Sequence, residues 1–269
     1  MSLTKIISVV LFIISILLAV YLYNSIHSTI KFRESIALTE KQITEKLEII
    51  REAEKVYLEQ HGRYTSNWDS LISFIENGTV PITVRTETVI PRSYGNDSIH
   101  VKIDTIDHVS AKEKIFKKTY TINAADDGTF LNFFVNVGDE IVPKAKSYKM
   151  RKSNGRVEEL EFLEAGTISS LAKINSGDSL TKGKYLISFW KYQFNPKVDV
   201  KQLNIIPVSG KEFEIYTNQV DRNGVPVNVI HVWDPAPINP NRKASNEAKN
   251  RQPLQFGSKT DVGTAGNWE

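Results

Sequence analysis

The run IISVVLFIISILLAVYLY, residues 6–23, decides how this chain is organised, because it has no charged residue over a length that suits a lipid bilayer. An α-helix rises about 1.5 Å per residue, so this run covers about 27 Å of the ~30 Å hydrocarbon core. It therefore predicts a transmembrane anchor. A secretory signal peptide is the alternative, but its apolar core is usually about 7–15 residues long. No small-x-small cleavage site follows in AVYLYNSIHSTI.

The charges beside the run leave its orientation open, since Lys5 precedes it and Lys31 and Arg33 follow it. Residues 1–5 are too few to fold, so they form a leader and the rest of the chain lies beyond the span. We therefore expect one membrane span, with the leader in the cytoplasm and the C-terminal domain outside it. The absence of cysteine is compatible with an oxidising compartment.

Composition limits the classes of protein that fit. About 245 residues follow the span, enough for one large domain or two modest ones. Hydrophobic residues make up 41% of the chain and aromatic residues 10%, which favours a packed core over disorder. The formal net charge is only +3, so nucleic acid is not an expected partner.

Residues 24–61 predict an amphipathic helical stalk that continues the span, since they contain no Pro or Gly. One face of this helix carries an apolar stripe, which packs on its own domain or on neighbouring subunits. The stripe comprises Ile36, Ile43, Leu47, Ile50 and Tyr57. Gly62 stands where a glycine ends a helix, and residues 62–78 predict a second, short helix with Ser66 as its N-cap.

Residues 79–237 change to the alternating pattern of strands and predict a β-rich domain of one or two subdomains. Helices are expected there only around residues 157–163 or 169–173. Turn signals separate the strands, namely Tyr94–Asp97, Asp126–Gly128, Ser209–Gly210 and Arg222–Gly224. The fold class is therefore α+β, with a long N-terminal helix and a mainly antiparallel β domain.

Residues 238–269 lack periodicity and are rich in Pro, Asn, Gly and charge, which predicts an extended or loosely attached tail. Two aromatic residues in this tail, Phe256 and Trp268, have two open interpretations. Either they insert into surface pockets, or they are exposed on a mobile terminus.

The chain offers little catalytic chemistry, so no catalytic, metal or cofactor residue is predicted and the chain is not expected to be an enzyme. Gly177-Asp178-Ser179-Leu180 spells the motif of one esterase class, but His231 lacks the Asp that precedes the catalytic histidine of that class. A turn before a strand explains the same residues. The histidines show no metal-ligand spacing, and no glycine-rich phosphate loop occurs.

A basic segment, residues 143–156 (PKAKSYKMRKSNGR), has no acidic residue. Such a patch suits phosphate, an anionic lipid or an acidic partner surface, although basic loops are more often merely solvated. Its cations are Lys144, Lys146, Lys149, Arg151, Lys152 and Arg156.

The anchor, the stalk and the sequence REAEKVYLEQHGRYT, residues 51–65, together resemble the N-terminal layout of type IV pilins and type II secretion pseudopilins. The matching residues are Arg51, Glu52, Ala53, Tyr57, Gly62, Arg63, Tyr64 and Thr65. Residues 2–23 lack the glycine of a prepilin processing site and the glutamate at the fifth mature position. The whole chain is also similar to a family of uncharacterised single-pass proteins of Bacteroidota.

These resemblances imply a setting in the bacterial inner membrane, with the C-terminal domain in the periplasm. The first hypothesis is a non-enzymatic, pilin-like subunit of an envelope assembly, whose stalk binds other anchored proteins or copies of itself. The alternative is a periplasmic ligand-binding or sensing module, which uses the basic segment or a pocket in the β domain. A hydrolase that depends on Ser179 comes third.

Overall fold

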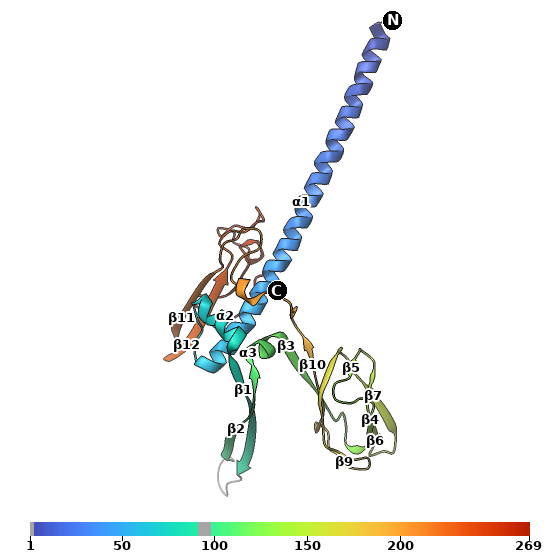
Figure 1. The fold of residues 1–269 in the computed structure, drawn as a ribbon, viewed down its shortest axis with the longest axis vertical. Helices are drawn as coiled ribbons and strands as arrows, with labels where there is room; N and C mark the ends of the chain where they lie inside the picture. Colours follow the sequence, from blue (N-terminus) through green and yellow to red (C-terminus); the bar gives the residue numbers. More distant parts are fainter. Residues whose placement is uncertain (1–2, 91–97) are drawn as a thin grey trace. The chain divides into compact units, whose positions relative to one another are not determined.

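The computed structural model describes residues 3–90 and 98–269, with side chains described at residues 7–8, 11–82 and 108–269. The chain forms two compact units (Figure 1). The first unit comprises the chain up to Lys55, His61–Trp68 and Lys201–Glu269. The second unit comprises Val56–Gln60 and Asp69–Val200. The class predicted from the sequence, a long N-terminal helix followed by a mainly antiparallel β region, is confirmed.

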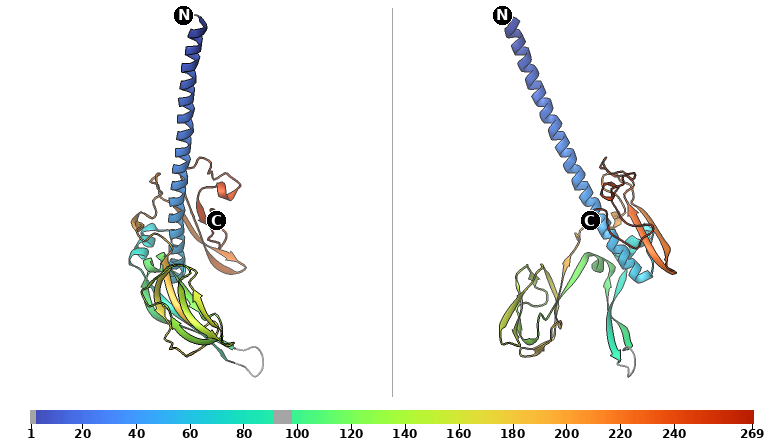
Figure 2. Two further views of the ribbon diagram at one scale, coloured as in Figure 1. Left: turned by 90° about the vertical axis from the view of Figure 1, so that its right-hand side faces the viewer. Right: turned by 180° about the vertical axis from the view of Figure 1, so that it is seen from behind.

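Helix α1 (Leu3–His61) joins the apolar run and the stalk without a break. Its interior has neither Pro nor Gly, so every backbone N–H after the first turn has an acceptor one turn earlier. The helix ends at His61, and Gly62 follows it with a φ of +70°, a conformation that glycine adopts without a steric penalty. In Figure 2 the first half of α1 projects alone, while the C-terminal segment of the first unit lies beside its second half.

The first unit completes its core with a three-stranded antiparallel sheet in the order β11 (Glu214–Arg222), β12 (Val225–Trp233) and β13 (Gln255–Gly257). The predicted turn between β11 and β12 is confirmed. Asn223 and Gly224 both have positive φ, 56° and 81°, as a two-residue hairpin turn of type I′ requires. Two short 3-10 helices, η1 (Val200–Gln202) and η2 (Lys249–Arg251), complete the elements of this region.

The second unit begins with α2 (Trp68–Asn77), the predicted short helix, whose Leu71 and Ile75 are buried. A long antiparallel ladder follows, made of β1 (Thr79–Ile90) and β2 (Ser98–Ser110). The turn expected at Tyr94–Asp97 lies outside the described residues. Helix α3 (Ala111–Phe116) follows β2, and the hydroxyl of Ser110 caps it by accepting from the backbone N–H of Glu113 at 3.1 Å.

The rest of the second unit is two four-stranded sheets that share one core. The first sheet has the order β3 (Lys117–Asn123), β10 (Tyr185–Tyr192), β8 (Gly166–Leu171) and β5 (Glu140–Ile141). The second has the order β7 (Val157–Glu161), β6 (Lys146–Lys152), β4 (Gly128–Phe133) and β9 (Ser179–Leu180). Among the core side chains are Phe130, Tyr148, Phe162, Ile187 and Phe189.

Two local predictions are wrong in this unit. Residues 157–161 and 166–171 form β7 and β8 where helices were expected, because each pairs with a neighbouring strand. The exposure of β7 alternates from residue to residue, as the pairing of a strand with one solvated face requires. Asp126–Gly128 is not a hairpin turn, since β3 pairs with β10 and β4 pairs with β6. These residues carry the chain from one sheet to the other, and Asp127 accepts a hydrogen bond from the backbone N–H of Lys182 at 2.7 Å.

Candidate functional site: helix α1 and the C-terminal segment

Helix α1 changes its environment near Ser35. Every described residue from Ile7 to Ser35 is exposed, and the large apolar side chains of the span expose about half or more of their surface. By length and composition, α1 is the one helix in the described part of the chain that suits a membrane. The exposure continues beyond the span, at Ile26, Ile30, Phe32 and Leu38. We call these four residues the uncovered stalk patch.

The apolar stripe predicted from the sequence lies on a covered face of α1 that begins at Ile36. Ile36, Ile43, Leu47 and Ile50 expose 9%, 1%, 0% and 0% of their surface, so residues of the same chain cover them. Tyr57 belongs to the second unit, where its ring packs edge-on against Phe74 at 5.2 Å. The sequence left open whether this stripe packs on its own domain or on neighbouring subunits. At residues 43–50 it packs within the chain, so this part is not available to partner helices.

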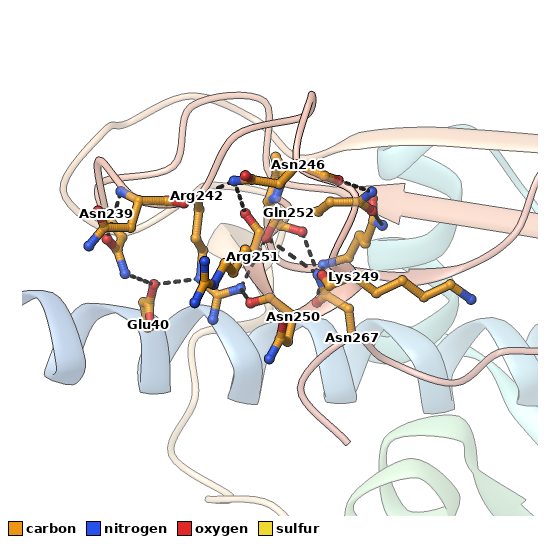
Figure 3. Close-up of polar contacts among 12 residues, drawn as sticks. Glu40, Asn239, Arg242, Asn246, Lys249, Asn250, Arg251, Gln252 and Asn267 are labelled. Carbon is orange, nitrogen blue, oxygen red and sulfur yellow. Dashed lines mark hydrogen bonds and ion pairs between the residues drawn. The ribbon is translucent and has the colours of Figure 1, made fainter.

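The C-terminal segment, residues 238–269, holds the second half of α1 through partly buried polar contacts (Figure 3). A carboxylate oxygen of Glu40 accepts from Arg242 Nε at 2.6 Å and from Asn239 Nδ2 at 2.9 Å. Glu40 and Arg242 expose only 22% and 15% of their side chains, so water screens this ion pair weakly. The pair fixes one point of the segment on the helix.

Arg242 also organises the segment itself, as Figure 3 shows. Its Nη1 donates to the backbone oxygens of Asn250 and Gln252, at 2.8 and 3.0 Å. Asn246 and Asn267 donate their amide hydrogens to other backbone oxygens of the same segment. The structure thus corrects the expected loosely attached tail. Individual side chains hold the segment in place, and it has no repeating apolar face. Its sequence therefore shows no hydrophobic periodicity.

The end of the segment returns to α1. Trp268 Nε1 donates to Glu48 Oε1 at 3.2 Å, Arg51 and Glu269 form an ion pair, and the guanidinium of Arg51 lies 5.9 Å from the ring centre of Trp268. Phe256, on β13, is 1% exposed. Both aromatic residues of the segment are therefore packed, as one of the two sequence interpretations proposed. We call the contacts of Glu40, Glu48 and Arg51 with this segment the helix clamp.

A second anchor of the first unit involves Lys46, which donates to the backbone oxygens of Gln202 and Ile205, both at 2.6 Å. These carbonyls lie at the end of η1 and just after it, where the chain returns from the second unit. The polar residues of α1 at positions 40, 46, 48 and 51 are thus structural, a role that no sequence motif signals.

Glu54 is a fully buried acid on the same helix. Its Oε2 accepts from the backbone N–H of Thr65 at 3.1 Å, whereas its Oε1 has no partner among the described atoms. Burial raises the pKa of Glu54 to about 8, so the carboxyl group is largely protonated at neutral pH. Burial, together with the nearby Glu54, also raises the pKa of Tyr64.

The basic segment of the sequence is largely neutralised where it forms β6. Its partner strand β7 supplies the acids: Lys146 and Lys149 lie 2.5 and 3.1 Å from Glu159, and Lys152 lies 2.8 Å from Glu158. The salt bridges of the described residues include none for Lys144, Arg151 or Arg156. Half of the proposed anionic-partner patch is therefore matched by carboxylates of the neighbouring strand, which weakens its attraction for a ligand.

Ser179 occupies an exposed position at the start of β9, and Asp178 accepts a hydrogen bond from the backbone N–H of Asn175 at 2.9 Å in the preceding turn. His231 belongs to the other unit. The described side chains include no group of three or more His, Asp or Glu residues that would hold a metal ion.

No protein-family model matches this chain, and no curated protein matches it. The geometry of α1 and the C-terminal segment is therefore the basis for a functional proposal.

Proposed function

We propose that this protein is a non-enzymatic, membrane-anchored subunit of a bacterial envelope assembly, pilin-like in its layout. In this proposal, α1 crosses the inner membrane once, and the two units lie in the periplasm. The observation that carries the proposal is the change along α1, from an apolar half whose described residues are all exposed to a half packed in its own chain.

The exposed apolar surface extends past the length that a bilayer covers. Ile26, Ile30, Phe32 and Leu38 follow the span and expose between 48% and 64% of their surface. Burial of apolar surface contributes about 25 cal/mol per Å², so covering four such side chains favours association by several kcal/mol before entropy is subtracted. Partner helices in the same membrane would cover the uncovered stalk patch and the span together.

The helix clamp supports a mechanical role for α1. Glu40, Glu48 and Arg51 tie the helix to the C-terminal segment of the same unit. A subunit that is held through its first helix must transmit force to its globular part without unfolding. Partly buried ion pairs between distant positions, such as Glu40–Arg242, tie the helix to that part.

The natural chain contains no cysteine, so single cysteines report contacts cleanly. We would place one at Ile30 or Leu38 in the uncovered stalk patch and, as the control, one at Lys173, an exposed residue of the second unit. A short bismaleimide linker is then added to native membranes. Adducts above the mass of the chain are expected at Ile30 and Leu38 and not at Lys173.

The proposal is wrong if the Ile30 and Leu38 variants stay at the mass of the chain, or if Lys173 cross-links equally well. Charged substitutions at Ile43 or Ile50 are unsuitable for this purpose. Both residues are buried in the chain itself, so such substitutions unfold the first unit.

A further inference from the structure

The first unit contains a polar pocket whose lining residues take no part in the helix clamp. It lies between β12, β13 and the loop that follows β13, and its volume is about 380 Å³. Pockets that hold small ligands have about 300–1,000 Å³. The side chains that matter on its wall are His231, Lys249, Gln255, Ser258, Lys259 and Asp261.

The loop after β13 is held in one shape by its own hydrogen bonds. Ser258 N–H donates to Ile230 O at 2.8 Å, and Gly257 N–H donates to Ala265 O at 3.1 Å. The hydroxyl oxygen of Ser258 accepts from the backbone N–H groups of Thr260 and Asp261, at 3.2 and 3.1 Å. A ligand would therefore meet a preformed wall and would not have to order the loop.

Most polar side chains of the wall already have partners inside the protein. Gln255 pairs with Gln252 and His231, and the carboxylate of Asp261 forms an ion pair with Arg222. Burial lowers the pKa of His231, and the positive charge of Lys259 lowers it further, so the imidazole is neutral at pH 7. These groups neither attract nor repel an anion strongly.

In contrast to Asp261 on the same wall, the ammonium groups of Lys249 and Lys259 form no salt bridge with any of the described side chains. The Lys259 ammonium lies 4.7 Å from the ring centre of Trp233 and 5.4 Å from that of Tyr216, which limits its motion. Figure 3 shows the Lys249 side chain extending away from the polar network, with no dashed line at its end. Two ammonium groups with no carboxylate partner among the described side chains thus line one pocket, and the one carboxylate on its wall, that of Asp261, is paired with Arg222.

We propose that this pocket binds a small phosphate monoester, whose dianionic phosphate is held by Lys249 and Lys259. Two ammonium groups match two negative charges, and a phosphate monoester carries close to two charges at neutral pH. The remaining volume accommodates a small polar group attached to the phosphate. A phosphodiester, as in a common phospholipid headgroup, carries only one charge at its phosphate and is expected to bind more weakly. This inference is independent of the proposed envelope assembly.

The test is isothermal titration calorimetry on the full chain in detergent, at pH 7.5 and low salt, with inorganic phosphate, glycerol 3-phosphate or dimethyl phosphate. We expect Kd values of about 1 mM or below for the first two. Dimethyl phosphate, the monoanionic diester, should bind about 10-fold more weakly or not at all.

The variants Lys249→Gln and Lys259→Gln should each weaken binding of glycerol 3-phosphate about 10-fold. Lys211→Gln is the matched control, since Lys211 is an exposed lysine of the same unit and is not on the pocket wall. Thermal melting establishes that each variant is folded, and Lys249→Gln removes no contact that holds the loop. The inference is overturned if the natural chain gives no saturable heat up to about 20 mM ligand. Equal effects of Lys211→Gln and Lys249→Gln, or equal affinity for dimethyl phosphate, would overturn it as well.

Discussion

Glu40 on helix α1 and Arg242 in the C-terminal segment form a 2.6 Å ion pair although 202 positions separate them in the chain. The pair is only 15–22% exposed, and Arg242 also donates through Nη1 to the backbone oxygens of Asn250 and Gln252. One side chain therefore both folds the C-terminal segment and attaches it to the helix.

Replacing Arg242 with alanine should release the C-terminal segment. The change removes the cation from the Glu40 carboxylate, which keeps only Asn239 as a donor, and it removes the Arg242 hydrogen bonds to two carbonyls. Breaking such a partly buried pair costs about 3–5 kcal/mol. Urea denaturation measures the loss, and limited proteolysis should cut within residues 238–254 much faster than in the natural chain. Lys243→Ala is the control, because Lys243 is the next residue in the chain and its side chain is exposed. This change should alter the free energy of unfolding by no more than about 0.5 kcal/mol. Equal effects of the two changes would rule out the role given to Arg242.

Two leucines of α1 separate packing within the chain from packing against partners. Leu47 is 0% exposed and Leu38 is 64% exposed. Leu47→Ala should lower the free energy of unfolding by about 2–5 kcal/mol, whereas Leu38→Ala should lower it by less than about 0.5 kcal/mol. Denaturation of both variants under the same detergent conditions provides the comparison. A large loss at Leu38 would mean that the chain itself covers this position.

Glu54 should make the first unit less stable as the pH rises. Below pH about 4.5 the carboxyl group is neutral in both the folded and the unfolded chain, so its contribution is fully present. Between that pH and about 8 only the unfolded chain ionises, and stability falls by up to about 5 kcal/mol. Above pH 8 the loss levels off. Stability measured from pH 5 to 9 should show this fall.

Glu54→Gln is the matched variant, because glutamine keeps the shape and cannot ionise. It should flatten this part of the pH profile and leave the variant more stable than the natural chain at pH 8. A profile with the same slope as that of the natural chain would assign the pH dependence to other groups.

An arginine in the middle of the apolar run should weaken insertion into the membrane. Ile14→Arg places a charge near the centre of the run, at a cost of about 2.5–3.5 kcal/mol. Tyr23→Arg, at the end of the run, should have little effect because its side chain reaches the interface. The fraction of protein that resists alkaline carbonate extraction measures insertion. The proposed anchor is wrong if the natural chain is extracted completely.

Gly257 should not tolerate a side chain. Its φ is +78°, and a Cβ atom would lie 2.0 Å from the backbone oxygen of Ile230, so Gly257→Ala forces the β12–β13 pair apart. We expect a loss of at least about 2 kcal/mol. Gly263→Ala, in the same loop, is the control because a Cβ atom there meets nothing within 4 Å. Thermal melts of the two variants should differ clearly.

Local patterns in the sequence predicted much of the fold. The period of the apolar residues between Ile36 and Ile50, with no Pro or Gly nearby, predicted the helix and the face that is buried. Asn223-Gly224 predicted the β11–β12 turn because few other residues adopt two successive positive φ values. Such signals are readable because each depends on residues a few positions apart.

The failures involve pairing between distant segments. Residues 157–161, with charge on most positions, became a strand because their glutamates face the lysines of β6. The same pairing removed half of the basic patch that the sequence alone indicated. The residues of the proposed phosphate pocket escaped notice, since Lys249 and Lys259 match no motif and meet only because η2 and the loop after β13 fold toward each other.

The sequence by itself determined that the chain has one long helix, apolar enough at its start to cross a membrane, followed by antiparallel strands. The length of an apolar run and the period of its apolar residues are local properties. They indicate a helix or a strand whatever the rest of the chain contains. Only the tertiary structure decided which part of the helix stays uncovered, since burial depends on what the remote C-terminal segment covers. Contacts such as Glu40–Arg242 and Glu48–Trp268 join single residues about 200 positions apart and leave no periodic trace in the sequence.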